Sequence, residues 1–88
     1  MFFRQLEYLV TLAREQHFAR AAEACNVSQP ALSAAIRRLE EELGVSIVER
    51  GQKFVGLTED GARILGWARQ TLAAWDGLKQ EASISRAQ

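Results

Sequence analysis

The segment from residue 18 to residue 37 constrains the fold of this chain most, because its residues have the spacing of two short crossing helices joined by a tight turn. Ala22 falls where the first helix must approach the second, which only a small side chain allows. Asn26 falls at the turn, and asparagine tolerates the left-handed backbone needed there. Leu32 is expected to point from the second helix into the shared core. The segment therefore predicts a helix-turn-helix.

The second helix is predicted over residues 29–43, with two chemically different faces. Ser28 is its predicted N-cap, and Pro30 fits the first turn because the amide that it lacks would have no partner there. The apolar residues expected to pack in the core are Leu32, Ala35, Ile36, Leu39 and Leu43. The other face is polar or small and carries no acidic residue before Glu40. It can therefore approach the phosphates of a nucleic-acid groove without repulsion.

The net charge of the chain is zero, with eleven basic and eleven acidic residues, whereas nucleic-acid binders are usually basic. The acidic residues, however, fall largely outside the second helix's polar face. Residues 40–42 are three glutamates, which we interpret as a solvated surface in contact with Arg37 and Arg38. These two arginines are the only charges between Asn26 and Glu40. The charge of the segment between Asn26 and Glu40 is therefore positive but small.

A small β-hairpin is predicted over residues 45–57, because β-branched and apolar residues flank the turn sequence at residues 49–53. Arg50 and Lys53 fall at or beside its tip. Two interpretations of these charges are open: contact with phosphates in an adjacent groove, or ordinary solubilising charge on an exposed turn. Arg50 has a third possibility, pairing with Glu49 or the edge of the core.

A long helix is predicted from Thr58, its N-cap, to about Glu81, followed by a frayed tail. Apolar residues along it alternate steps of four and three, as in a heptad seam. The seam comprises Ile64, Ala68, Thr71, Trp75, Leu78 and Ala82. An exposed apolar stripe on so small a domain requires a partner, so the seam predicts dimerisation. The alternative is that the stripe packs back on its own domain.

The remaining residues are expected to have a structural role rather than a catalytic or ligand-binding one. One amphipathic helix near the amino terminus, expected to complete a three-helix core, has an apolar face of Phe3, Leu6, Leu9, Val10 and Ala13. His17 and the single Cys25 have no partner at metal-ligand or catalytic spacing, so no catalytic residue, metal or cofactor is expected. The lone cysteine, with no transmembrane run and no secretory signal, favours the cytoplasm.

Several short motifs recur together in one known family. They are SQPALS at residues 28–33, LE..LG at residues 39–44, Arg50, and LT..G at residues 57–61. With them, residues 17–61 resemble the DNA-binding domain of the LysR-type transcriptional regulators. The resemblance implies a mainly α fold, with a winged helix-turn-helix (a three-helix core plus a small β-hairpin wing) in residues 1–58. Residues 59–88 would then be a linker helix for dimerisation and a tail.

The resemblance also implies that helix 29–43 lies in the major groove of double-stranded DNA. The DNA-binding residues that it implies are Ser28, Gln29, Pro30, Ser33, Ala34, Arg37, Arg50 and Lys53. At Ala34, and at Ala35 beside it, family members often carry a long polar or basic side chain. Alanine offers only a methyl contact, so base readout is expected to lean more on DNA shape here.

By the same resemblance, linker helices pair two subunits into a homodimer that reads an interrupted palindrome, with a tetramer possible in the full-length protein. Family members carry a larger domain that binds a small-molecule effector, so we expect the chain to be a fragment without that domain. The alternative from another class is a winged-helix protein-interaction module, whose polar face meets a protein and which does not bind DNA.

Overall fold

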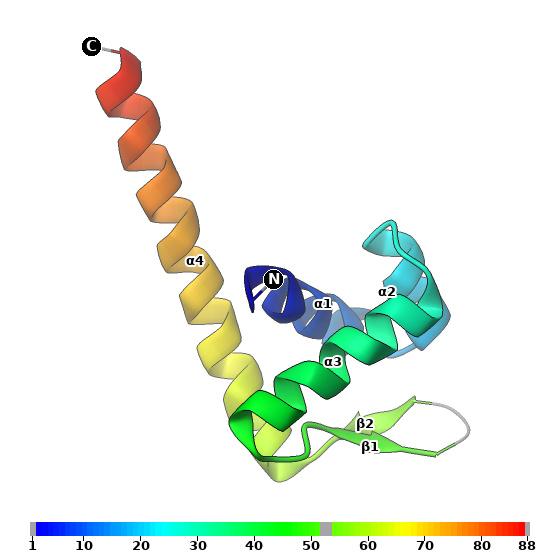
Figure 1. Ribbon diagram of the computed structural model, residues 1–88. Helices are drawn as coiled ribbons and strands as arrows, with labels where there is room; N and C mark the ends of the chain where they lie inside the picture. The colour runs from blue at the N-terminus through cyan, green and yellow to red at the C-terminus, as the bar shows by residue number, and fades with distance from the viewer. Residues whose placement is uncertain (1, 52–53, 88) are drawn as a thin grey trace.

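The computed structural model describes residues 2–51 and 54–87, which form four helices and one antiparallel two-stranded sheet (Figure 1). The elements are α1 (Phe2–Glu15), α2 (Phe18–Ala24), α3 (Gln29–Leu43), β1 (Val48–Arg50), β2 (Phe54–Leu57) and α4 (Glu59–Ala87). Helices α1, α2 and α3 pack into a three-helix core, and the β1–β2 hairpin stands beside α3 as a wing. The predicted mainly α, winged helix-turn-helix fold is confirmed.

The turn between α2 and α3 has the geometry that the sequence predicts. Asn26 has a φ of 61°, in the left-handed region. Ala22 is buried, and its carbonyl accepts a hydrogen bond from the Val27 amide at 3.0 Å. Leu32 is fully buried on the inner face of α3. Each residue therefore fills the role expected from its position.

Local caps fix both ends of α3. The Ser28 hydroxyl oxygen accepts a hydrogen bond from the Ala31 amide at 3.2 Å, which satisfies one of the free donors of the first turn. At the other end Gly44 takes a φ of 72°, and its amide donates to the Glu40 carbonyl at 2.8 Å. The helix bounds are those predicted from the sequence.

The core lies where α1, α2 and α3 meet, and it extends to the residues that lead into the wing. The largest fully buried side chains are Leu9, Leu12, Leu32, Ile36, Leu39 and Ile47. Helix α1 buries Leu6, Leu9 and Leu12, while Phe3 and Val10 of its predicted apolar face lie half-buried at the margin. The inward face of α1 is thus rotated slightly from the predicted one.

Helix α4 differs from the prediction in length and in packing. It continues to Ala87, so the expected frayed tail after Glu81 is wrong. Its inner face is formed by Gly61, Leu65, Ala68 and Leu72, which pack on the core. Ala68, assigned to the dimerisation seam from the heptad spacing, is only 2% exposed and is covered by its own domain.

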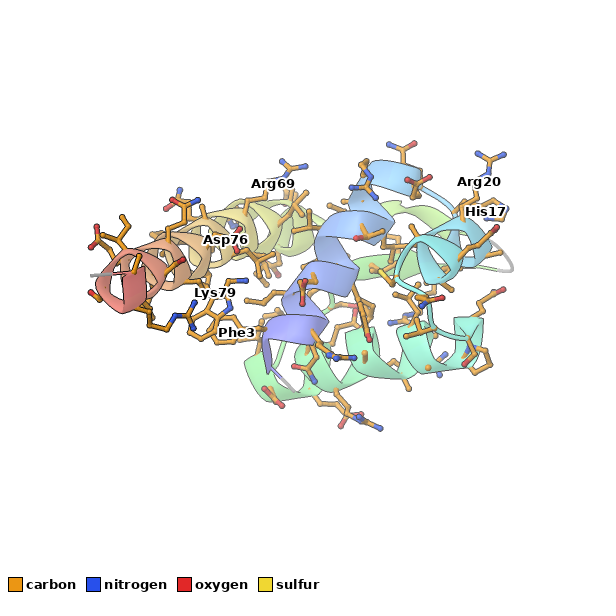
Figure 2. The ribbon with its side chains drawn as sticks, turned by 90° about the horizontal axis from the view of Figure 1, so that it is seen from above. Phe3, His17, Arg20, Arg69, Asp76 and Lys79 are labelled. Atoms are coloured by element: carbon orange, nitrogen blue, oxygen red, sulfur yellow. The ribbon has the colours of Figure 1, made fainter. Side chains whose placement is uncertain are left out.

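Further along α4, the Trp75 ring stacks on Phe3 of α1 with 4.9 Å between ring centroids. Figure 2 shows Phe3 on the side of α1 that faces α4. The first half of the predicted seam is therefore used within the subunit, as the alternative interpretation expected. Residues 73–87 are all exposed, including Leu78 and Ala82 of the seam. Beyond Trp75, α4 projects away from the other elements (Figure 1).

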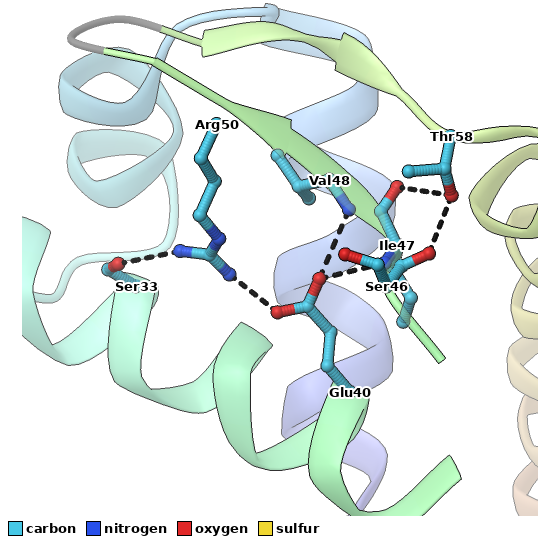
Figure 3. Close-up of polar contacts among 7 residues, drawn as sticks. All are labelled: Ser33, Glu40, Ser46, Ile47, Val48, Arg50 and Thr58. Atoms are coloured by element: carbon cyan, nitrogen blue, oxygen red, sulfur yellow. Dashed lines mark hydrogen bonds and ion pairs between the residues drawn. The ribbon is translucent and has the colours of Figure 1, made fainter. Parts of the chain in front are cut away.

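The junction between wing and α4 depends on Thr58 and Gly61. The Thr58 hydroxyl donates to the Ser46 carbonyl at 2.6 Å (Figure 3), and it accepts from the Gly61 amide at 2.8 Å as the N-cap of α4. A Cβ on Gly61 would lie 2.1 Å from the Ile47 carbonyl oxygen. Only glycine lets the first turn of α4 approach this backbone so closely.

Gly61→Ala is expected to lower the free energy of unfolding by about 1–3 kcal/mol, because the new methyl group must displace backbone rather than a flexible side chain. The matched control is Gly66→Ala on the same helix, where nothing lies within 4 Å of the added Cβ. That control should gain about 0.5–1 kcal/mol from helix propensity. Chemical denaturation of both variants measures the difference, and equal effects would contradict the close approach.

Candidate nucleic-acid interface

Helix α3 carries one uncovered face. In Figure 1, α1 lies above α3 and the hairpin below it, and Figure 2 shows α3 at an outer side of the molecule. Its buried residues, Leu32, Ala35, Ile36 and Leu39, all face the core. The amino-terminal half of the opposite face is therefore open to a large partner.

The structure brings five of the predicted DNA-binding residues to this open face. Gln29, Pro30 and Arg37 are exposed, and Ser33 and Ala34 are half-buried between them. Helical geometry places all five within less than half a turn around the axis. Arg37 has no ion-pair partner within residues 2–51 and 54–87, so the predicted contact with residues 40–42 is wrong. Its guanidinium is free to meet an anion.

Ser28 stands at the amino-terminal end of the same face. Its hydroxyl oxygen caps α3, while its own proton remains able to donate to a second acceptor. The helix dipole favours negative charge at this end. No acidic residue occurs in the first turn of α3. The end of α3 thus has the chemistry of a phosphate contact.

Glu40 does not lie on a solvated surface, contrary to the sequence interpretation. One carboxylate oxygen, Oε2, accepts from the Ile47 amide at 2.7 Å and the Val48 amide at 3.2 Å (Figure 3). The other, Oε1, accepts from Arg50 Nη2 at 2.8 Å. The side chain is only 14% exposed. Glu40 therefore joins α3 to the strand that begins the wing.

Arg50 is the last residue of β1, beside the wing tip as predicted. Its guanidinium pairs with Glu40, and its Nη1 donates to the Ser33 hydroxyl at 3.3 Å (Figure 3). A β-bulge between Glu49 and Arg50 shifts the register of the hairpin here. With its side chain 25% exposed and directed at α3, Arg50 holds the wing against the helix. Of the two structural partners considered from the sequence, Glu49 and the edge of the core, the contact with the largely buried Glu40 corresponds to the second.

The environment of Glu40 shifts its pKa. Partial burial alone would raise the pKa, but hydrogen bonds from the Ile47 and Val48 amides and the Arg50 guanidinium outweigh that effect. The pKa of Glu40 consequently lies below its ordinary value of 4.5. The carboxylate is charged at neutral pH, as the contact with Arg50 requires.

Lys53, the second basic residue assigned to the wing, lies outside the described residues. Its predicted contact with DNA stays a prediction.

Residues 3–62 match the family model described as bacterial regulatory helix-turn-helix protein, lysR family. The chain belongs to the lysR family. Its resemblance to LysR-type regulators, drawn from the motifs above, is confirmed.

Members of the lysR family with known roles are close in sequence and structure. The DNA-binding transcriptional dual regulator OxyR of Escherichia coli (strain K12) is 49% identical over 83 residues, which cover 94% of this chain and 27% of OxyR. The solved BenM_DBD/catB site 1 DNA complex is 36% identical with a TM-score of 0.87, covering 94% of this chain and 89% of that one. The CbnR_DBD-DNA complex is 35% identical with a TM-score of 0.86, and each chain is fully covered.

These matches favour DNA binding over the protein-interaction alternative. The chain spans about a quarter of the length of the curated relatives that it matches first. No helix within the described part of this lysR-family chain is long and apolar enough to cross a membrane.

Glu40→Gln is expected to lower the free energy of unfolding by about 2 kcal/mol at pH 7, because it removes a charged acceptor from two amides and an arginine. A lowered pKa in the folded state stabilises the fold above pH 4.5, and this effect is lost as the pH falls through the folded-state pKa. The difference between wild type and variant should therefore narrow below pH 4.5. Urea denaturation across pH measures it.

Glu41→Gln is the matched control, since Glu41 is the exposed neighbour of Glu40 on the same helix. It should change stability by less than about 0.5 kcal/mol. A gap between Glu40→Gln and wild type that stays constant down to pH 3 would contradict the assigned role of the Glu40 carboxylate.

Proposed function

We propose that this chain is the DNA-binding part of a transcriptional regulator of the lysR family, and that it reads double-stranded DNA with α3 in the major groove. The observation that carries the proposal is the open amino-terminal face of α3, which has polar and basic side chains and no carboxylate. Solved complexes of two similar domains with DNA support it. An α-helix fits the major groove, which is about 12 Å wide.

Each residue of the open face supplies a distinct kind of contact. The Gln29 amide can bond both groups that adenine presents in the major groove, and Pro30 and Ala34 can contact a thymine methyl group. Ser33 donates its hydroxyl proton while Arg50 occupies a lone pair on its oxygen. Ser28 and Arg37 hold phosphates on either side, and Lys53 would extend this contact along the wing.

The functional unit in this proposal is a homodimer joined through the carboxyl-terminal half of α4, with a tetramer in the longer protein. Leu78 is 60% exposed on that half, in line with Ala82 at helical spacing. Such a dimer would place two copies of α3 on half-sites about 34 Å apart, or a multiple of it, in an interrupted palindrome. A small-molecule effector would act through a further domain, as in other family members, within the cytoplasm.

Selection of preferred sites from a random duplex pool, at about 0.15 M salt where nonspecific attraction is partly screened, tests the proposal directly. Enrichment of an interrupted palindrome supports sequence-specific reading by a dimer. A pool that stays random, with no salt-dependent binding to any duplex, would overturn the DNA-binding function and leave the protein-interaction module.

Gln29→Ala should cost about 1–3 kcal/mol on the selected duplex and relax the preference at one base pair, because it removes a bidentate contact to a base edge. Gln70→Ala, on the exposed surface of α4, is the matched control and should bind as wild type does. Titration by fluorescence anisotropy on the selected duplex and on single-base variants measures both. An unchanged base preference would remove Gln29 from the reading residues.

Leu78→Glu should weaken the dimer at least tenfold, because it places an unpaired charge in an apolar interface. Ile84→Glu is its control: Ile84 is 56% exposed, similar to Leu78, but falls on another side of α4. Sedimentation equilibrium gives the dissociation constants. Equal effects of the two variants would show that the seam is not the interface.

A further inference from the structure

We propose that a cleft between α1 and α3, flanked by Arg4 and Arg38, binds a backbone phosphate of the DNA strand opposite to the one that the wing approaches. This inference rests on the proposed function, because it requires α3 to lie in the major groove. It adds α1, which the helix-turn-helix assignment treats as support, to the DNA-binding surface.

The cleft has a volume of about 230 Å³, room for several solvent molecules at roughly 30 Å³ each. Helix α1 contributes Arg4, Gln5 and Tyr8, and α3 contributes Ala31, Ala34 and Arg38. Both arginines are exposed, and neither has an ion-pair partner in the part of the chain that the structure describes. No carboxylate lines this cleft. Its chemistry is that of an anion site.

Gln5 gives the cleft a polar floor. The residue is 6% exposed, and its Oε1 has no hydrogen-bond partner among the described residues. A buried amide left unpaired is costly, and binding that satisfies it is favoured. Because Oε1 is an acceptor, it is satisfied by a water molecule that also donates a hydrogen bond to a phosphate oxygen held between the two arginines.

With α3 in the major groove, phosphate contacts are needed on both sides of the helix. A helix in the major groove has one phosphate backbone on each side. Ser33 and Glu40 lie on the side of α3 where the wing is attached, while Ala31 and Arg38 lie on the side that faces α1. Figure 1 shows α1 and the hairpin on opposite sides of α3. The cleft therefore stands where the second backbone passes.

Ala34 keeps the cleft open. Its methyl group is half-buried at the rim, between the reading face and the cleft. A long side chain here would extend over the space between Arg4 and Arg38. Alanine at this position removes a contact with a base but leaves Arg4 and Arg38 accessible to a phosphate. Part of the affinity for DNA then comes from the phosphate backbone instead of from base edges.

The test compares salt dependence on the selected duplex. The double variant Arg4→Ala/Arg38→Ala should reduce the magnitude of the slope of log K against log salt concentration by about 0.9 per bound subunit, the value for one lost phosphate contact, and Arg4→Ala and Arg38→Ala should each account for part of that reduction. Base preference should stay unchanged. Arg4→Lys keeps the charge and should keep the slope, and Arg69→Ala, on α4 away from α3 in Figure 2, is the control for a distant arginine.

Slopes for Arg4→Ala and Arg38→Ala equal to those of wild type and Arg69→Ala would overturn the inference while leaving DNA binding intact. A change of base preference instead of slope would also overturn it, because the arginines would then contact bases. Failure of the wild-type chain to bind any duplex in a salt-dependent way would overturn the proposed function, and the inference with it. Thermal melts of each variant confirm that the fold is retained.

Discussion

The carboxylate of Glu40 holds the wing against α3, and the geometry of the open face of α3 depends on that contact. It accepts two backbone amides from the chain that enters β1 and the guanidinium of Arg50, which in turn reaches Ser33 on α3. A hairpin with only three pairs of facing residues buries too little surface to hold its own position. Charge-assisted hydrogen bonds in a partly buried place are strong enough to do so. A residue of the reading surface and a residue of the wing thus belong to one polar network.

A second contact completes this arrangement from the other side. Ile47, which directly precedes β1, is buried, and its carbonyl lies against Gly61 at the start of α4. Thr58 caps α4 and at the same time holds the Ser46 carbonyl. The wing is therefore clamped between α3 and α4 at its base. The LE..LG and LT..G motifs of the sequence, which look unrelated when read along the chain, contribute residues to the same junction.

The sequence predicted those features whose cause is local. Ser28 and Gly44 mark the ends of α3 because capping depends on adjacent residues, and Asn26 marks the turn because few residues adopt its backbone. The prediction of a solvated Glu40 is wrong because its hydrogen-bond partners lie seven to ten residues away. A turn separates them from Glu40, and hydrophobic periodicity does not predict the direction that the chain takes after a turn. The inner face of α4 differs from the predicted apolar seam for another reason. Heptad spacing identifies an apolar stripe, but it does not distinguish packing within a subunit from packing between subunits.

Helix α4 is continuous from the base of the wing to Ala87, a length of about 44 Å at 1.5 Å per residue. Phe3 and Trp75 brace it partway along, so the segment before the brace moves with the three-helix core. The segment beyond it acts as a lever arm. The twelve residues from Asp76 to Ala87 span about 18 Å, so a tilt of about 11° shifts the far end by roughly 3.4 Å, one base-pair step along the DNA axis. In the proposed dimer, a tilt of this size where the two α4 helices meet would move each three-helix core, with its α3, by about one base pair while the core itself stays rigid.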